Sequence, residues 1–468
     1  MATTITSQPK ASMLCSTLIP ISFTVQDTGA TTTNIIAECY VVDQTTAVQT
    51  QLGGRFRMAP MLNVSQSYQF DASEIFNSKT KSLLSDFNSL GTNGGAPATY
   101  FNWQDKASFF VGIRFYREYI DAAGLIVVDP SYTQSNYFYV FEGVPNVEWL
   151  HQAVSDNGQN RGAFYYFDST YRAGVQWIRW FTNYPIKMLA GGVRESYVTI
   201  HQDEQYMLMF LAPRSAYTGC DYQIEFLTYS NDPSLPSPLG GHQVPLTYDD
   251  NVQSICCGFR DLIHGFTAGG NEGANFANVD YYTVNMLTNI TNTGFCNYLE
   301  YNTRYVFKVD RSCKKNSGYL RFAFKNMVGG YDLVSSNGKY TRKVKNKFED
   351  FEKTLGYYGW NTYKEFGKSN WNNTQIEQYV VRTELMRKDR AEHFAEMMSS
   401  TQVYLRVKQT ADLLVQDPEL AEPIGEQPYT FVPIVIKGGS TSFDESADNY
   451  VSIKFTFEKA VNQRTPRY

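Results

Sequence analysis

The sequence predicts a mainly β protein, built from several β-sandwich-like domains with a few short helices and long loops. Three observations lead to this fold class. Apolar and polar residues alternate with a period of two in many short runs, as they do in half-buried strands. Gly, Asn and Asp interrupt these runs at short intervals, which is typical of turns. The chain is also rich in Tyr and Phe, with 34 and 31 copies, and aromatic residues favour strands.

Five runs show the alternation most clearly. In the first run, the apolar residues Ile21, Phe23 and Val25 are separated by Ser22 and Thr24. The other four runs place their apolar residues at Val111, Ile113 and Phe115, at Tyr222, Ile224 and Phe226, at Leu320, Phe322 and Phe324, and at Val451, Ile453, Phe455 and Phe457. Each run is predicted to be a strand with one buried face.

Helical spacing is scarce. The strongest candidate runs from Thr383 to Ser399, with Thr383 as a predicted N-cap and an apolar stripe that includes Phe394 and Met397. Two further short helices are predicted at 73–90 and 344–355. All three are expected to pack against sheets.

The length of 468 residues corresponds to about three domains. Changes in composition divide the chain into an N-terminal arm at 1–16, a β domain at 17–145, a second β domain at 146–230, a stretch of linker and long loops at 231–280, and a C-terminal β domain with short helices at 281–468. The linker is predicted from a Pro-rich segment at 231–245 and a Gly- and Asn-rich segment at 265–280.

The overall charge argues against a general nucleic-acid binder. Lys and Arg number 41 and Asp and Glu number 46, so the net charge is −5, whereas nucleic-acid binders are usually basic. No apolar run has the length of a membrane span, and the first twenty residues do not resemble a cleavable signal. The seven cysteines include no CxxC pair, so we expect them to be reduced and half-buried: Cys15, Cys39, Cys220, Cys256, Cys257, Cys296 and Cys313.

The sequence offers no constellation for catalysis. None of the five histidines lies at ligand spacing from another, and the phosphate loop, calcium loop and nucleophile elbow motifs are absent. Adjacent carboxylates such as Glu349 and Asp350 would point to opposite faces of a strand, so they cannot flank one glycosidic bond. We therefore expect no catalytic residue, no cofactor and no metal, and a protein that is not an enzyme.

The charge is most uneven between Arg304 and Lys347. This window holds 12 basic and 2 acidic residues, a charge of +10, which leaves −15 for the rest of the chain. Either this basic face docks on an acidic protein surface or on nucleic acid, or it is a solvated strand edge that lysines protect from pairing. We favour a protein partner, and a second copy of the chain offers the complementary charge. The candidate interface residues are Arg311, Lys314, Lys315, Lys339, Arg342, Lys343, Lys345 and Lys347, with Trp360 and Tyr363 from the aromatic segment that follows.

Two segments near the C-terminus resemble virion structural proteins of crAss-like tailed bacteriophages. In the first, Tyr319–Glu349, an alternating strand leads into a Gly-Gly-Tyr-Asp turn and a basic stretch. The second joins a short helix at 384–398, a strand at 402–407 and the segment FVPIVIKGGSTSFDESADNYVSIKFTFEKA from Phe431. The resemblance implies a neck, ring or tail-hub subunit, which forms a symmetric homo-oligomer in the virion after assembly in the host cytoplasm.

The partners that this resemblance implies are copies of the chain itself, other neck or tail proteins and the portal. Any DNA contact is expected to be non-specific, and no membrane contact is expected. Two alternatives stay open. A glycan- or receptor-binding adhesin would present an exposed aromatic platform near Trp177 or Trp360. A carbohydrate-active hydrolase would need two carboxylates about 5 to 9.5 Å apart in a cleft.

Overall fold

The structure is a computed structural model of the chain. It describes residues 3–9, 13–29, 32–43, 46–61, 66–80, 101–104, 108–143, 165–166, 179–180, 182, 184, 187–188, 194–201, 206–212, 220–245, 249–259, 262, 276–290, 296–298, 304–311, 320–336, 338–353, 367–408, 429–440 and 450–459. The chain divides into two compact units. The first holds residues 1–85, 93–311 and 326–332, and the second holds 86–92, 312–325 and 333–468.

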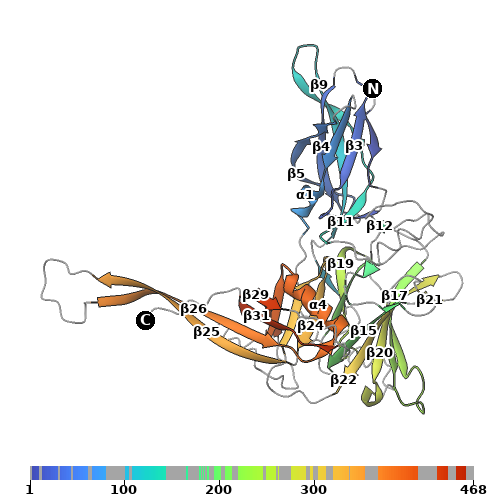
Figure 1. Cartoon of the computed structure of the whole chain (residues 1–468). Helices are drawn as coiled ribbons and strands as arrows, with labels where there is room; N and C mark the ends of the chain where they lie inside the picture. Colours follow the sequence, from blue (N-terminus) through green and yellow to red (C-terminus); the bar gives the residue numbers. More distant parts are fainter. Residues whose placement is uncertain are drawn as a thin grey trace. The chain divides into compact units, whose positions relative to one another are not determined.

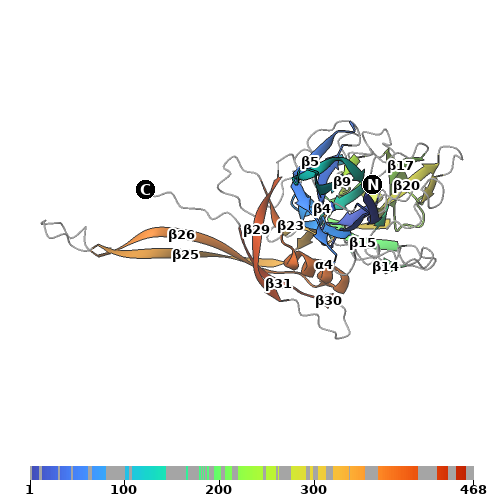
Figure 2. The same cartoon turned by 90° about the horizontal axis from the view of Figure 1, so that it is seen from above.

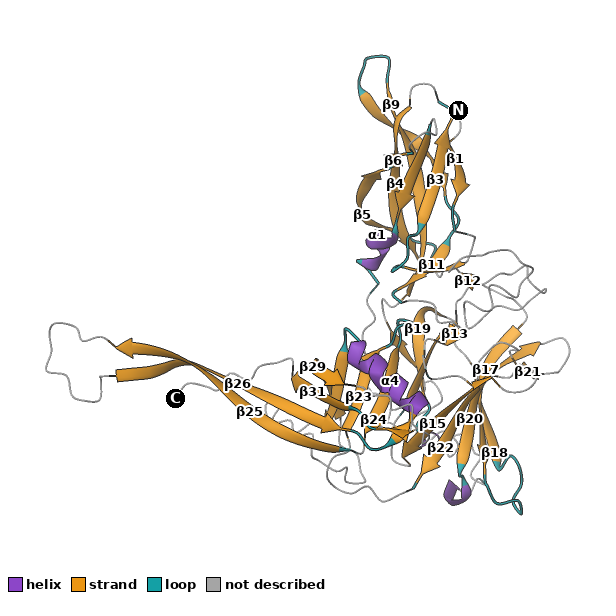
Figure 3. Ribbon diagram, viewed as in Figure 1, coloured by secondary structure: helices purple, strands orange, loops and turns teal. Residues whose placement is uncertain are grey.

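The predicted mainly β fold class is confirmed. Strands grouped in several separate sheets make up most of the described chain (Figure 3). The described helices are short: α1 (Ser73–Asn77), α4 (Lys388–Ser399) and the 3-10 helix η3 (Phe276–Asn278). None of them has the length and apolar character of a membrane-spanning helix.

The first unit begins with two sheets that share one core. The first sheet has the order β1-β3-β7-β6, and the second has the order β12-β2-β11-β9-β4-β5, with β10 paired to β9. Their strands are β1 (Thr3–Ser7), β2 (Met13–Ser16), β3 (Ser22–Asp27), β4 (Thr32–Val42), β5 (Gln49–Arg57), β6 (Ala59–Pro60), β7 (Ser67–Asp71), β9 (Ser108–Ile120), β10 (Ile126–Gln134), β11 (Phe138–Phe141) and β12 (Tyr165–Tyr166).

Alternation along these strands builds the core of this first sandwich. Phe23 and Val25 on β3 and Ile113 and Phe115 on β9 are fully buried in the same cluster, as the sequence predicts. The Phe23 ring centroid lies 5.7 Å from that of Phe115, so the two sheets pack directly face to face. Burial of each such side chain contributes about 1.5–3 kcal/mol.

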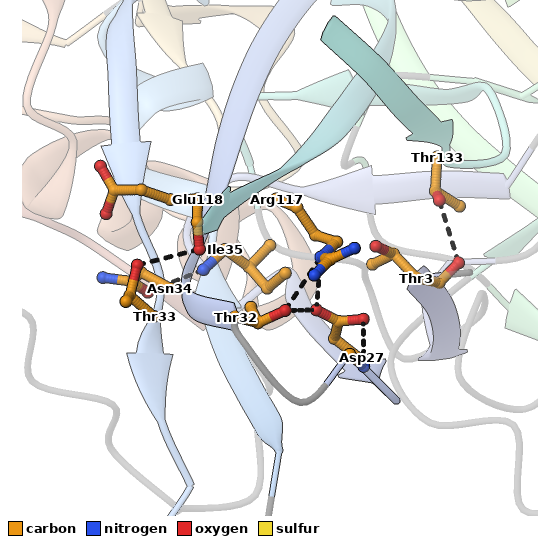
Figure 4. Close-up of polar contacts among 10 residues, drawn as sticks. Thr3, Asp27, Thr32, Thr33, Asn34, Ile35, Arg117, Glu118 and Thr133 are labelled. Carbon is orange, nitrogen blue, oxygen red and sulfur yellow. Dashed lines mark hydrogen bonds and ion pairs between the residues drawn. The ribbon is translucent and has the colours of Figure 1, made fainter. Parts of the chain in front are cut away.

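A buried ion pair ties the turn after β3 to strand β9 (Figure 4). The carboxylate of Asp27 is fully buried and lies 3.0 Å from the Arg117 Nε atom. It also accepts hydrogen bonds from the backbone N–H of Gly29, at 3.0 Å, and from the hydroxyl of Thr32. Arg117 Nε in turn donates to the Thr32 hydroxyl at 2.9 Å. Because these groups satisfy one another's hydrogen bonds and charge, they fix the loop between β3 and β4 to the sandwich.

Two more sheets follow in the first unit. One has the order β13-β16-β19-β8, and the other has the order β14-β15-β22-β20-β17-β18, with β21 paired to β20. Their strands are β8 (Phe101–Gln104), β13 (Arg179–Trp180), β14 (Lys187–Met188), β15 (Arg194–His201), β16 (Met207–Ala212), β17 (Cys220–Tyr229), β18 (Gly240–Pro245), β19 (Asp249–Cys256), β20 (Tyr281–Ile290), β21 (Cys296–Tyr298) and β22 (Arg304–Asp310).

Aromatic rings join these two sheets. Trp180 on β13 packs edge-on against Tyr305 on β22, with ring centroids 5.2 Å apart. Tyr282 on β20 stacks on Phe307 at 5.0 Å, and its hydroxyl donates to the Cys257 carbonyl at 2.5 Å. Trp180 is therefore a core residue of this part of the fold, not an exposed platform.

The second unit is organised around one seven-stranded sheet, here called the C-terminal sheet. Its order is β24-β23-β28-β29-β31-β26-β25. The strands are β23 (Leu320–Lys325), β24 (Tyr331–Ser336), β25 (Lys339–Lys353), β26 (Gly367–Arg382), β28 (Val403–Lys408), β29 (Tyr429–Ser440) and β31 (Lys454–Lys459), and a separate pair is formed by β27 (Met386–Arg387) and β30 (Tyr450–Val451). Helix α4 packs on this sheet through Phe394 and Met397, which are fully buried with Phe322, Phe455 and Phe457.

The helix predictions have three different outcomes. Helix α4 begins at Lys388 and not near Thr383, because Met386 and Arg387 pair with β30. The predicted N-cap is wrong, since Arg387 holds that position and the Thr383 hydroxyl accepts from the Ile453 N–H at 2.8 Å. The helix predicted at 344–355 is also wrong: residues 344–353 belong to β25 and pair with β26, so cross-strand pairing overrides the local spacing. Of the helix predicted at 73–90, residues 73–77 form α1, and residues 81–90 lie outside the described part.

Two glycines permit one close backbone approach in the first unit. Gly329 has a φ of +97°, and a Cβ atom there would lie 1.9 Å from the Glu142 carbonyl oxygen. A Cβ atom on Gly143 would lie 2.2 Å from the Val328 carbonyl oxygen. The Gly-Gly pair at 329–330 is thus a turn that needs glycine, as predicted.

Four of the cysteines are described as free thiols, as predicted, but they are buried and not half-buried: Cys15, Cys39, Cys256 and Cys257. Burial, with a smaller contribution from the neighbouring Glu38 carboxylate, raises the pKa of the Cys39 thiol to about 12. Such thiols stay protonated at neutral pH and are poor nucleophiles.

Two segments predicted to be an arm and a linker contain strands. Residues 3–7 and 13–16 of the predicted N-terminal arm form β1 and β2. Residues 240–245 and 249–256 of the predicted linker form β18 and β19. As a division of the chain into domains, the five predicted segments stay a prediction.

We predict that Asp27→Asn lowers the free energy of unfolding of the first unit by about 3 kcal/mol, because it leaves the Arg117 guanidinium with no counter-charge. Urea unfolding followed by fluorescence measures the change. The control is Asp129→Asn, since the Asp129 carboxylate accepts from the Ser131 N–H at 2.9 Å on the exposed β10 strand. The control is expected to change stability by less than about 0.5 kcal/mol. Equal losses in the two variants would contradict the role given to Asp27.

Candidate interaction surface

The longest strand pair of the second unit extends beyond its sheet. β25 pairs with β26 from Lys339–Arg382 to Lys353–Gly367, but only Gln378–Arg382 of β26 pair with β31. We call the remainder, residues 344–353 and 367–377, the hairpin ribbon. Figures 1 and 2 show it leaving the C-terminal sheet as a twisted pair of strands. At about 3.3 Å per residue, its outer strand is roughly 30 Å long.

The hairpin ribbon has no third strand among the described residues. β25 is the edge of the C-terminal sheet, and its described strand partner is β26 alone. In an antiparallel pair every second residue points its N–H and C=O groups to the outer side. A two-stranded hairpin alone is only marginally stable in water, so the ribbon depends on its attachment to the C-terminal sheet.

The register contains one irregularity, and it lies on β26. Glu349 pairs with Asn372, whereas Asp350 pairs with Asn370. Trp371 is therefore an extra residue on β26, which is a β-bulge, while β25 runs without interruption.

Strand alternation sorts the basic residues at the root of the hairpin ribbon. Lys339, Lys343 and Lys345 occupy alternate positions of β25 and are exposed. Arg342 lies on the opposite face, where it pairs with Glu377. Val344, on that same face, is 47% exposed, so both faces are open to solvent at this point.

The acid Glu377 anchors the ribbon to its sheet. Its carboxylate pairs with Arg342, lies 3.4 Å from the Lys459 Nζ atom and accepts from the Tyr379 hydroxyl at 2.9 Å. Tyr379 is fully buried and stacks on Phe457 with ring centroids 4.9 Å apart. Burial alone would raise the pKa of Glu377, but the hydrogen bonds from Arg342 and Tyr379 and the charge of Lys459 outweigh it, so the pKa is lowered.

The predicted interface residues do not form one patch within either unit. Lys339, Arg342, Lys343, Lys345 and Lys347 lie on β25 of the second unit. Arg311 belongs to the first unit, where its guanidinium donates to the carbonyls of Val279 and Phe276, at 2.5 and 2.9 Å, and lies 3.6 Å from an Asp280 oxygen. The side chain of Lys347 lies outside the described residues, as do Lys314, Lys315, Trp360 and Tyr363 entirely.

A second surface lies on the outer face of the first sandwich. The Arg114 guanidinium carbon is 4.8 Å from the ring centroids of both Tyr40 and Tyr132. Tyr132 also packs on Tyr116 at 5.6 Å and is 48% exposed. Burial and contact with Tyr137 raise the pKa of the Tyr40 hydroxyl. Rings held in place by guanidinium groups form a rigid, partly exposed aromatic face.

No metal-binding cluster of three or more His, Cys, Asp or Glu side chains occurs among the residues that the structure describes. His393 on α4 is buried and packs against the Phe324 ring at 5.1 Å. Trp177, near which the adhesin alternative expects an aromatic platform, lies outside the described residues.

Comparisons with known proteins give no family for this chain. No family model matches it, and no curated protein matches it. Among solved structures, it matches the calcium binding domain CBD12 of CALX1.1, with 8% identity over 64% of this chain and 96% of that chain, and a TM-score of 0.15. A TM-score this low supports no conclusion about fold or function.

Sequence analysis missed the hairpin ribbon, although a signal for it is present. The spacing of Val344, Phe348 and Phe351 suggested a helix. The lysines at 343, 345 and 347 instead repeat with a period of two, which is typical of a strand with one charged face.

We predict that Glu377→Gln lowers the stability of the second unit at pH 7 by about 1–2 kcal/mol, because a neutral amide loses the charge-assisted bonds to Arg342 and Lys459. The folded-state pKa of Glu377 is lowered, so its contribution is complete above the unfolded value of about 4.5 and is lost as the pH falls below it. Thermal unfolding of both proteins from pH 7 to pH 3 should show their difference shrinking below pH 5. Glu392→Gln, on the exposed side of α4, is the control, and a difference that stays constant with pH would refute this role.

Proposed function

We propose that this chain is a structural subunit of a bacteriophage tail or neck. In this role it assembles into a symmetric ring or hub through contacts with its own copies, with other neck or tail proteins and with the portal. It acts by shape and adhesion, not by catalysis, and its place is the virion.

The observation that carries this proposal is the hairpin ribbon. Its root is anchored by Glu377, Tyr379 and Lys459, while its outer strand has no strand partner among the described residues. In a free monomer, a long ribbon with an open edge leaves backbone groups without a strand partner. In an assembly, the same ribbon can extend roughly 30 Å and pair with a neighbouring subunit.

The resemblance to crAss-like virion proteins supports the same role. The segment 319–349 spans β23, β24 and most of the basic part of β25. The second segment spans α4, β28, β29 and β31. Together they account for most strands of the C-terminal sheet.

A closed symmetric assembly would also resolve the open edges. Contacts that repeat through such an assembly, whether across a two-fold axis or around a ring, bury the same surfaces on every copy and leave no subunit with an uncovered strand. A specific contact of this kind buries more than about 1,000 Å².

We expect the purified protein to form a closed oligomer with a discrete mass, seen by mass photometry and by class averages in negative-stain electron microscopy. Micrographs of virions should show a ring or hub of matching size at the neck or tail. A protein that stays monomeric at high concentration, together with virions that lack such a ring, would refute the proposal.

A glycan-binding adhesin is the second candidate, and the exposed ring of Tyr132, which lies against Arg114 and the buried ring of Tyr116, favours it. An exposed ring held by a guanidinium group is suited to stacking on a sugar ring. If this candidate holds, a glycan array gives a signal that Tyr132→Ala reduces at least tenfold, while Tyr450→Ala, which removes an exposed ring on β30, leaves it unchanged. Absence of any array signal removes the candidate.

A further inference from the structure

The charge along β25 changes sign at its midpoint. From Lys339 to Lys347 the strand carries five basic residues and no acid: Lys339, Arg342, Lys343, Lys345 and Lys347. Immediately afterwards come three acids, Glu349, Asp350 and Glu352, before the final Lys353. The switch therefore lies inside the hairpin ribbon, on the strand whose outer edge has no described strand partner.

Edge lysines commonly prevent pairing between sheets, and a uniformly basic strand would serve that purpose. The acidic half argues against this explanation. A strand that is basic in one half and acidic in the other repels a parallel copy of itself, because each half then meets its own sign. It attracts an antiparallel copy, because each basic half then meets an acidic half.

We propose, resting on the assembly role proposed above, that β25 is a homotypic docking edge, which pairs antiparallel with β25 of a second copy around a two-fold axis near Lys347 and Phe348. With the axis at Lys347, Lys345 lies opposite Glu349 of the second copy and Arg342 lies opposite Glu352. With the axis at Phe348, Lys347 lies opposite Glu349. The first register sets Lys347 opposite itself at the axis, and the second sets Lys343 opposite Lys353. The first register therefore brings more opposite charges together, and both place Glu349 opposite a lysine.

Backbone geometry fits this pairing. The bulge at Trp371 lies on β26, so the outer edge of β25 keeps a regular series of N–H and C=O groups. Two ribbons that pair in this way form a four-stranded antiparallel sheet, in the order β26-β25-β25-β26. That sheet passes the three-strand minimum for independent stability, which neither ribbon reaches alone.

The test exchanges charges between two variants of the full-length protein. The first, Lys345→Glu with Lys347→Glu, makes the basic half of the hairpin ribbon acidic. The second, Glu349→Lys, reverses the acid that faces position 345 or 347 in the two registers. Each variant alone meets like charges in the homotypic pair, so we expect its self-association at this edge to weaken at least about tenfold. Mixing the two is expected to restore a heterodimer, because the lysine introduced at position 349 of one variant then meets a glutamate introduced at position 345 or 347 of the other, while the unchanged Glu349 meets an unchanged lysine.

The matched control is Lys79→Glu with Lys388→Glu, which changes two exposed lysines outside β25 and gives the same change in net charge as the first variant. Mass photometry and analytical ultracentrifugation measure association at two salt concentrations, and the wild-type contact should weaken as salt increases. Hydrogen exchange adds a second readout: the outward-pointing amides of residues 344–353, which are every second one, should become protected with rising concentration, whereas amides of β24 should not change.

Each outcome decides the matter. Weak association of both variants with recovery on mixing supports the docking edge, and a misfolded variant cannot produce that recovery. Undiminished association of the single variants, or no concentration-dependent protection of residues 344–353, overturns it. Rings that persist in both variants refute the strand pairing but leave the assembly role intact, whereas wild-type protein with no assembly in solution or in virions refutes both.

Discussion

Every β-strand has two edges, and the backbone groups on each edge need a partner. This constraint organises the second unit. In the described C-terminal sheet, β23, β28, β29, β31 and β26 each lie between two strands, while β24 and β25 are the two edge strands. The ribbon then carries the open edge of β25 beyond the sheet. Its root is stable because Glu377 and Tyr379 connect it to β31, so the sheet supplies the rigidity that two strands alone do not have.

Charged side chains follow two distinct patterns in this chain. Inside the first sandwich, Asp27 and Arg117 form a closed network with Thr32, in which each group satisfies another and none is offered to a partner. On β25, Lys339, Lys343 and Lys345 are exposed and face away from the ion pair at Glu377. The basic window of the sequence is therefore not one surface. Part of it, including Arg311, fixes local structure in the first unit, and the part on β25 is available for contacts.

The sequence was sufficient for the fold class and for the buried face of several strands, because period-two patterns such as Phe23-Val25 and Phe455-Phe457 depend only on which face meets the core. It failed where pairing over long distances decided the outcome. Residues 344–353 have helical spacing but join β26, and Thr383 resembles an N-cap but bonds to Ile453, 70 residues away. For the candidate surface, the basic residues were visible in the sequence, but their division between two units and their alternation on an edge strand followed from strand registers that composition does not encode.

The bulge at Trp371 shows how this strand pair accommodates an extra residue. A hairpin absorbs an added residue by distorting one of its strands, and here the distortion falls on β26, the strand already held on both sides at its root. The backbone N–H and C=O groups of β25 therefore keep the regular spacing of an undistorted strand. An inserted residue on β26 can thus be accommodated as a bulge without a change in the outer edge of β25.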